Sequence, residues 1–382
     1  LLGVVSGGGV DTNVFPIYLY KYFAPYIQHD WKVSRRLTLN LGLRWDLNVS
    51  PNERFDRMNR SFDPDVLNPV DRLVNKALLP GPKTLRGGLL FANVGDIPRT
   101  ASNLDRNNIQ PRAGAAYQIT EKLVARGGWG LYFLNPNNDY LQTTGYSTST
   151  PLITSNNGGR NPIAGSASNP FPSGLLRPAG ASLGLETFLG RGFNFVNPEF
   201  DVPYTHQFSF GFQYEMPWRT KLDVSYVGNR TRKMQTSRPF NDTDLEYRNR
   251  CNLADGGNPF FCDERLPNPF RGLAPFTGTN HFTDETIGRG ALYRPMPHFT
   301  GLTEVTRNDG GVWYNSLQAI YEIRGSAGLN FNLAYTLSKM ISQDGYMDTK
   351  RDLLQRSLYD WDRPHRIVAA SIYDLPIGRG KR

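Results

Sequence analysis

Residues Arg36 to Leu47 read R-L-T-L-N-L-G-L-R-W-D-L, and apolar and polar side chains alternate through the whole stretch. The apolar set is Leu37, Leu39, Leu41, Leu43, Trp45 and Leu47, and the set between them is Arg36, Thr38, Asn40, Gly42, Arg44 and Asp46. Successive side chains of a β-strand point to opposite faces of its sheet. The stretch therefore predicts a strand with one apolar face and one polar face.

The same alternation recurs in residues 205–215 and 329–338. A sheet that is apolar outside and wet inside is what a transmembrane barrel needs. We therefore predict an all-β fold: a partial, antiparallel, up-and-down transmembrane β-barrel of about nine long strands. The segments that we expect to form these strands are 18–32, 36–48, 109–119, 123–134, 203–215, 221–230, 312–324, 329–341 and 364–375.

The connections between these segments alternate between short and long. Short turns are expected at 32–35, 120–122, 216–220 and 325–328, whereas the stretches 49–108, 135–202 and 231–311 are long and rich in Gly, Asn, Ser and Pro. Successive connections of an up-and-down barrel lie on opposite rims, and outer-membrane barrels have short periplasmic turns and long external loops. We expect the long stretches to be irregular loops that are functional or disordered.

Composition restricts the other classes of protein. No apolar run approaches the roughly 18 residues of a transmembrane helix, which excludes a helical membrane protein. The 43 Lys and Arg outnumber the 34 Asp and Glu, for a net charge of +9, but they are scattered, so we expect no nucleic-acid partner. Lipopolysaccharide phosphates or an acidic ligand at the outer rim remain alternative partners for this charge.

The ends and the cysteines add two expectations. The chain begins Leu1-Leu2 without Met, and we expect a fragment whose export signal lies upstream. Cys251 and Cys262 are the only cysteines. In an exported protein their proximity favours a local disulfide that contributes up to roughly 3 kcal/mol, and the alternative is two unpaired thiols.

Several motifs follow one another in an order that resembles a known family. Residues 22–33 read Y-F-A-P-Y-I-Q-H-D-W-K-V and run directly into the strand at 36–45. The further motifs are N-N-I-Q-P-R-A-G at 107–114, R-G-G-W-G at 126–130, V-S-Y-V-G-N-R at 224–230, Y-N-S-L-Q at 314–318, A-Y-T-L-S-K at 334–339, D-R-P-H-R at 362–366 and L-P-I-G-R-G at 375–380. Together they resemble the barrel of TonB-dependent outer-membrane receptors, and in particular the Oar-like subgroup, whose members usually carry a carboxypeptidase-regulatory-like domain.

The resemblance implies a receptor in the outer membrane of a Gram-negative-type bacterium. Such families place a plug in a 22-stranded barrel and import ligands with energy relayed from the inner membrane. The implied partners are outer-membrane lipid and lipopolysaccharide, a TonB-type energy-transducing complex, and an unknown ligand such as a peptide, a protein or a carbohydrate. No segment of this chain resembles the plug or the regulatory-like domain, so we expect residues 1–382 to be a partial barrel whose plug and later strands lie elsewhere.

Charged side chains on the polar faces are candidates for a lumen that meets the plug or the ligand. A charge on the lipid face costs roughly 2–4 kcal/mol at mid-depth, which favours the interior for the set, although an ordinary solvated sheet is the alternative for each residue. The lumen candidates are Arg36, Arg44, Arg112, Arg126 and Arg324, with Lys221 and Asp223. The candidates for an interfacial aromatic girdle are Tyr22, Trp31, Trp45, Phe133, Tyr204, Trp218 and Trp313.

Ligand contacts are expected in the long loops, although loop aromatics often pack only against each other. The candidates are Tyr140, Tyr146, Arg160, Phe171, Phe195, Phe260 and Phe270. The sequence contains no H-E-x-x-H, G-x-S-x-G, C-x-x-C or phosphate-loop motif, so we expect no enzyme and no cofactor. Asp242, Asp244 and Glu246 match no complete calcium loop, so we expect no metal site there.

Two other kinds of protein remain open. A non-transporting surface or adhesion protein of the same fold would lack a plug and a TonB-contacting segment. A soluble β-sandwich would bury the leucine face against a second layer. Nine strands are the wrong parity for a closed bacterial barrel, so we expect an open, curved sheet or a forced closure.

Overall fold

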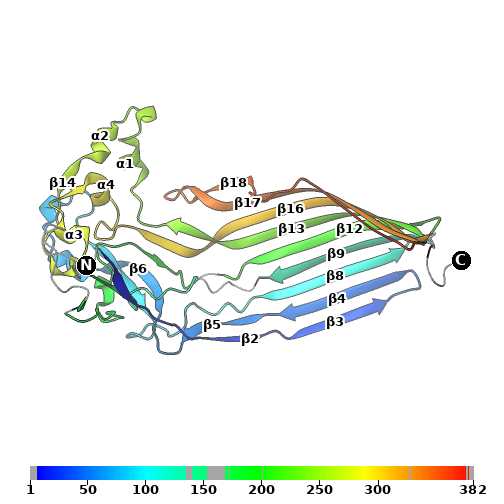
Figure 1. The fold of residues 1–382 in the computed structure, drawn as a ribbon, viewed down its shortest axis with the longest axis horizontal. Coiled ribbons are helices and arrows are strands. Elements are labelled where there is room, and N and C mark those ends of the chain that lie inside the picture. Colours follow the sequence, from blue (N-terminus) through cyan, green and yellow to red (C-terminus); the bar gives the residue numbers. More distant parts are fainter. Residues whose placement is uncertain are drawn as a thin grey trace.

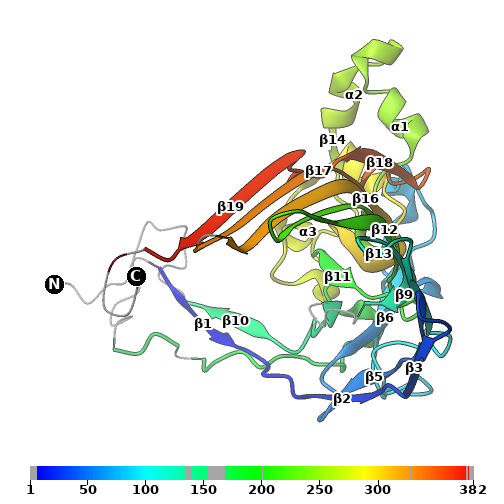
Figure 2. The same ribbon diagram turned by 90° about the vertical axis from the view of Figure 1, so that its right-hand side faces the viewer.

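The computed structural model describes residues 7–134, 140–152, 168–171, 173–199, 201–326, 328–375 and 377. Its main feature is an eleven-stranded, almost wholly antiparallel sheet whose strands run side by side along the length of the molecule (Figure 1). Viewed along the strands, the sheet curves into an open trough (Figure 2). This architecture confirms the prediction of a partial up-and-down barrel.

The strands pair in the order β18 (Leu353–Leu358), β17 (Leu329–Asp348), β16 (Leu302–Ser326), β13 (Thr220–Pro239), β12 (Tyr204–Met216), β9 (Leu123–Phe133), β8 (Ile109–Gln118), β4 (Leu37–Trp45) and β3 (Tyr26–Lys32), with β19 (His365–Tyr373) beside β17 and β11 (Phe193–Phe195) parallel beside β16. Each of the nine predicted segments overlaps one of these strands. The short strands β11 and β18 were not predicted.

The structure corrects the ends of several segments. The segment 18–32 is interrupted at Ala24-Pro25, where proline has no N–H for the ladder, and it forms β2 (Tyr18–Phe23) and β3. A break at Asp46 separates β4 from β5 (Leu47–Glu53), which pairs with β2. Strands β13, β16 and β17 are far longer than predicted, because their backbones stay paired beyond the region of alternating side chains.

The four short turns lie together at one end of the sheet, as predicted, and their sequences explain them (Figure 1). The hydroxyls of Ser34 and Thr120 accept hydrogen bonds from the backbone N–H groups of Leu37 and Leu123, both at 3.1 Å. Met216 pairs with Thr220, so the third turn has a three-residue connection in which Trp218 and Arg219 adopt the left-handed region, with φ of 60° and 57°.

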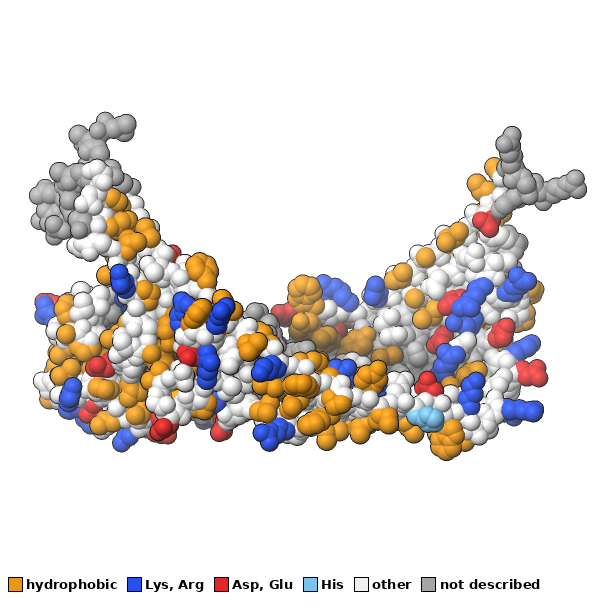
Figure 3. Space-filling model, turned by 90° about the horizontal axis from the view of Figure 1, so that it is seen from below, with side chains coloured by type: hydrophobic (Ala, Val, Ile, Leu, Met, Phe, Trp, Pro, Cys, Tyr) orange, Lys and Arg blue, Asp and Glu red, His pale blue; other side chains and the backbone are white. Residues whose placement is uncertain are grey.

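Strand register places the two kinds of side chain on opposite faces. One row across five strands is Gln28, Gly42, Arg112, Gly130 and Gln207, and the adjacent row is His29, Leu41, Ala113, Trp129 and Phe208. The second row belongs to the face that carries the exposed large apolar side chains, among them Leu41, Leu43 and Phe210. Hydrophobic side chains gather along the convex margin of the middle section (Figure 3).

The end opposite the turns carries a folded cap, which corrects the expectation of irregular loops. Its elements are β6 (Asn59–Leu67), β7 (Arg86–Phe91), η1 (Pro69–Arg72), η2 (Lys76–Leu78), η4 (Gly184–Glu186), α1 (Leu245–Asn249), η5 (Leu253–Asp255), α2 (Pro259–Asp263), β14 (Arg265–Pro267), η6 (Ala274–Phe276), α3 (Asn280–Thr283), β15 (Thr286–Gly288) and α4 (Arg289–Leu292). A separate ribbon of β1 (Gly9–Thr12) and β10 (Thr148–Pro151) extends from one edge (Figure 2). No helix in the described ranges is long and apolar enough to cross a membrane.

The cap has a hydrophobic core to which all three long stretches contribute. The ring of Phe62 lies 5.1–6.2 Å from the rings of Phe193, Phe195, Phe240 and Phe299. Burial of each such ring is worth roughly 1.5–3 kcal/mol, so the apolar residues of these stretches stabilise one another.

Three buried asparagines of the cap form hydrogen bonds to backbone groups through both the N–H₂ group and the oxygen of their side-chain amides. The amide N–H₂ of Asn68 donates to the carbonyls of Gly87 and Leu185, both at 2.8 Å, and its side-chain oxygen accepts from Val70 N at 3.1 Å. Asn241 donates to the carbonyl of Met296 and accepts from its N–H, and Asn268 donates to the carbonyl of His281 and accepts from the N–H of Phe270. The asparagines that suggested irregular loops thus satisfy buried backbone groups.

Candidate functional site

The polar face of the sheet presents cations that are held by neighbouring strands. Arg112 donates from its guanidinium to Gln28 Oε1 at 2.6 Å, and Asn40 Nδ2 donates to Asp30 Oδ1 at 2.7 Å. Arg44 Nε lies 2.6 Å from Asp46 Oδ1, and its guanidinium also contacts the hydroxyl of Tyr22. These contacts place both arginines on the wet face.

Between these side chains lies a shallow recess of about 390 Å³. Its floor is formed by Gly114 and Gly128, and Gln28, Arg112 and Gln207 stand around it. Because glycines leave the backbone uncovered, another backbone or a ligand can approach this part of the wall closely.

The five predicted lumen arginines do not form one site. Arg44, Arg112 and Arg126 project from the body of the sheet, where Arg126 pairs with Gly211. Arg36 lies in the turn before β4, and Arg324 lies at the turn end of β16, where it pairs with Glu322 at 2.7 Å. Only the first three lie on the polar face in the middle of the trough. Lys221 also pairs with Glu322, at 3.4 Å.

The predicted girdle residues lie near strand ends except Trp313, which lies in the middle of β16, and the face of one residue is corrected. Phe133, Tyr204 and Trp313 are on the apolar face, and Trp218 is 83% exposed in a turn. Tyr22 instead contacts Arg44 on the polar face, because the break at Ala24-Pro25 ends the simple alternation there. Tyr22 therefore does not belong to a lipid-facing girdle.

Three of the predicted ligand-contacting aromatics are inside the cap. Phe270, Phe195 and Tyr140 are 0%, 5% and 6% exposed. Burial raises the pKa of the Tyr140 hydroxyl, which accords with its position away from water. These rings pack against other apolar side chains of the cap, so they are not exposed for contact with a ligand.

The other candidates differ in access. Phe260 is 82% exposed, and Phe171 is partly exposed. Tyr146 is half-buried, and its hydroxyl donates to the carbonyl of Asp56 at 3.0 Å. Arg160 lies outside the described residues.

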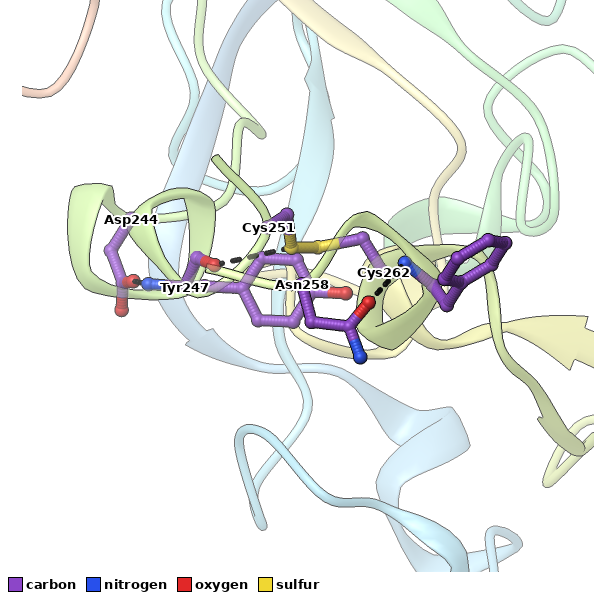
Figure 4. The surroundings of a disulfide bond; sticks show 6 residues. Asp244, Tyr247, Cys251, Asn258 and Cys262 are labelled. Atoms are coloured by element: carbon purple, nitrogen blue, oxygen red, sulfur yellow. Dashed lines mark hydrogen bonds between the residues drawn. A yellow bond between two sulfur atoms is a disulfide. The ribbon is translucent and has the colours of Figure 1, made fainter. Parts of the chain in front are cut away.

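Phe260 belongs to an arm that projects from the cap and contains α1, η5 and α2 (Figure 1). A disulfide joins Cys251 and Cys262, whose Cα atoms are 5.8 Å apart (Figure 4). Asp244 caps α1 by accepting from Tyr247 N at 2.7 Å, and Asn258 caps α2 by accepting from Phe260 N at 3.0 Å. The two caps and the disulfide hold the tip of the arm in one shape.

The acidic residues beside this arm are already engaged by protein groups. Asp242 accepts from the Thr349 hydroxyl at 2.8 Å, Asp244 is the cap just described, and Glu246 pairs with Arg250 at 2.6 Å. Within the part of the chain that the structure describes, no three metal-ligating side chains come together. The arrangement offers hydrogen bonds and apolar contacts to a ligand.

Sequence reasoning missed a charged network at the outer ends of β13, β16 and β17. The Arg307 guanidinium lies 2.9 Å from Asp309 and 3.0 Å from Asp352, and Arg238 lies 3.0 Å from the same Asp352. Asp352 lies in the turn between β17 and β18, so the network fixes that hairpin to its neighbours. Alternation along one strand carries no signal for pairs that form between distant strands.

Comparison with protein-family models identifies the class of fold. A family model described as "Outer membrane beta barrel domain" matches residues 1–382. No curated protein sequence matches the chain.

Receptors of bacterial outer membranes are among the solved structures that are similar to this chain. The ferric-catecholate import receptor Fiu from Escherichia coli K12 is 10% identical with a TM-score of 0.41, and the match covers 93% of this chain and 32% of Fiu. The pyoverdine receptor FpvA from Pseudomonas aeruginosa is 8% identical with a TM-score of 0.41 and is matched over 94% of this chain and 29% of its own. The alcaligin receptor FauA from Bordetella pertussis is 10% identical with a TM-score of 0.37, and the match covers 94% of this chain and 35% of FauA. The chain thus spans about a third of the length of these receptors.

Proposed function

The chain belongs to the outer-membrane β-barrel domain family and resides in the outer membrane of a Gram-negative bacterium, and from this premise we propose that it is part of a TonB-dependent receptor of the Oar-like kind. In this proposal the cap binds a ligand outside the cell, and the ligand passes through a lumen closed by a plug. The work is binding and conformational change, without covalent chemistry. Residues 1–382 would form one part of the barrel.

The proposal is supported by two features that occur together: a folded cap at one end of the sheet, and a polar face whose recess is lined by glycine backbone. Arg112 and Gln28 stand beside the bare backbone of Gly114 and Gly128. A wall of this kind suits close contact with a plug or with cargo that moves past it. The ordered series of motifs from residue 22 to residue 380 supports the receptor family.

The proposed partners follow from this location. A TonB-type complex would supply energy from the inner membrane, lipid would cover the apolar face, and lipopolysaccharide would surround the outer rim. The ligand would be a peptide, a protein or a carbohydrate that contacts exposed cap residues such as Phe260 and Phe171.

The projecting arm favours a second candidate, a surface or adhesion protein of the same fold. Its disulfide-held tip exposes Phe260 and Leu253, which are 82% and 73% accessible. A fixed apolar tip of this kind suits contact with another macromolecule.

Uptake measurements separate the two candidates. Cells that carry the full-length gene would be given a fluorescent tryptic digest of casein or fluorescent dextran and compared with a gene deletion and with cells whose TonB is inactivated. A receptor predicts uptake of one probe that both genetic changes abolish. An adhesin predicts surface binding that depends on the gene and is unaffected by TonB.

A further inference from the structure

Two arginines on the apolar face lie against one tryptophan ring. The guanidinium carbon of Arg232 is 5.4 Å from the ring centroid of Trp313, and that of Arg356 is 4.6 Å from it. Arg232 extends from β13 and Arg356 from β18, and both side chains are exposed. The two cations therefore reach the same ring from opposite sides of the strand pair β16 and β17.

Strand register shows that these residues share the face that meets lipid. Arg232 pairs with Gly311, Gly311 pairs with Gln343, and Gln343 pairs with Arg356. Trp313 is two residues from Gly311 and therefore lies on the same face. The next rows toward the turns add Arg230, which pairs with Trp313, and Lys339, which pairs with Asn315.

These cations differ from the other arginines of the outer end in their partners. Arg238 and Arg307 are paired with Asp352, and Lys233 is paired with Asp201 at 2.5 Å. Among the described residues, no carboxylate lies within ion-pair distance of Arg232, Arg356 or Lys339. No direct ion pair within the described residues therefore neutralises these three cations.

Like charges that share one ring repel each other, and an anion between them removes that repulsion. Guanidinium groups bind phosphate with several parallel, charge-assisted hydrogen bonds, and stacking on an aromatic ring orients their donors. The cluster thus has the chemistry of a phosphate site.

Its depth identifies the source of the phosphate. The pair Arg230–Trp313 lies ten residues along the strands from the pair Thr220–Ile323 at the turn end. Ten residues at about 3.3 Å each, tilted by about 40°, span roughly 25 Å, which is the height of the apolar band of such barrels. The cations therefore lie at the outer border of the membrane, where the lipid headgroups begin.

We propose that Arg232, Arg356 and Trp313, flanked by Arg230 and Lys339, bind the phosphate groups of the glycolipid of the outer leaflet, the lipid A part of lipopolysaccharide. Two unpaired guanidinium groups and an ammonium match the charge of a diphosphorylated headgroup, and Leu317 and Ile341 on the same face can contact its acyl chains. The proposal rests on the lipopolysaccharide contact proposed above and gives that contact its residues.

The test uses the full-length protein in detergent, titrated with diphosphorylated lipid A and followed by native mass spectrometry. The variant R232Q/R356Q should bind lipid A at least tenfold more weakly. The control R271Q/R351Q removes the same charge from two exposed outer arginines that already pair with Glu285 and Asp348, and it should bind like the wild type. Dephosphorylated lipid A should bind the wild type as weakly as diphosphorylated lipid A binds the variant.

The proposal is overturned if R232Q/R356Q keeps the wild-type affinity or if the control loses as much. It is also overturned if inorganic phosphate at millimolar concentration, or phosphatidylglycerol, binds as tightly as lipid A. R232K/R356K keeps the charge without the planar donors and should fall between the wild type and the glutamine variant. Because binding is measured on purified protein, failure here leaves the uptake experiment untouched, and the reverse also holds.

Discussion

Arg112 lies directly over Gly42, so that a Cβ atom added to Gly42 would come within 2.4 Å of Arg112 Nε. The two residues are paired across β4 and β8. The missing side chain allows the guanidinium to lie along the wall and reach Gln28. One glycine on the polar face thus provides room for a cation, and the leucines between the polar positions remain on the other side.

The two faces of β4 should respond differently to a new charge. Leu41→Arg places a cation on the lipid face, at a cost of roughly 2–4 kcal/mol at mid-depth. Asn40→Arg is the matched control, because it lies one residue away on the polar face beside Asp30. The yield of heat-modifiable, folded protein should fall for Leu41→Arg and stay near the wild type for Asn40→Arg and Thr38→Arg. Equal yields for Leu41→Arg and its controls would contradict the assignment of faces.

Two phenylalanines that look alike in sequence should differ in their effect on stability. Phe270 is fully buried, so Phe270→Ala should lower the free energy of unfolding of the cap by about 3–5 kcal/mol. Phe260 is 82% exposed, and Phe260→Ala should change it by less than about 0.5 kcal/mol. Urea unfolding monitored by limited proteolysis of the cap measures both. A Phe260→Ala variant as unstable as Phe270→Ala would show that the arm is packed in solution.

The disulfide should stabilise the arm and leave the sheet unaffected. Its loop is short, with a sequence separation of 11 residues, and removing such a bond costs up to about 3 kcal/mol. Cys251→Ser/Cys262→Ser should therefore speed amide hydrogen exchange in α1 and α2. Exchange in β12 and β13 serves as the internal control. Unchanged protection of α1 and α2 would mean that their caps alone fix the arm.

Acid should loosen the cap through His298. This side chain is fully buried, and burial lowers its pKa from 6.5 to about 3. In the unfolded chain His298 therefore takes up a proton near pH 6.5, whereas in the folded chain it stays neutral down to about pH 3. The free energy of unfolding of the cap consequently falls as the pH drops from about 6.5 to about 3. Burial also lowers the pKa of His281, so this side chain adds to the fall in stability with falling pH.

His298→Leu tests that pH dependence. Thermal unfolding of the cap between pH 7.5 and pH 4.5 should be less sensitive to pH in the variant than in the wild type, whatever its stability at pH 7.5. The same slope in both proteins would assign the pH dependence to other groups.

Much of the sheet could be predicted from the sequence because period-two alternation is a local signal. Leu41 and Asn40 reveal their faces through their immediate neighbours, and the turn at Pro217–Thr220 is marked by its composition. The signal weakens where strands leave the membrane, since both faces there meet water. That is why the outer halves of β13 and β16 were missed, although pairs such as Thr236 with Arg307 continue the ladder.

The cap could not be predicted because its contacts join residues that are far apart in the chain. Phe62, Phe195 and Phe299 come from three different stretches, and none shows that it belongs to a common core until the sheet brings the stretches together. The same holds for the Trp313 site. The sequence shows an interfacial tryptophan, but only the register brings Arg232 and Arg356 to its ring.

Lipid covers one set of alternate side chains of β4, and water wets the other. Single spin labels at each position from 37 to 46 of the full-length protein, reconstituted in bilayers, distinguish the two sets. Collision rates with oxygen should peak at 37, 39, 41, 43 and 45, and those with a water-soluble nickel complex should peak at the positions between them. Accessibility that does not alternate from one residue to the next would show that lipid and water do not divide the strand in this way.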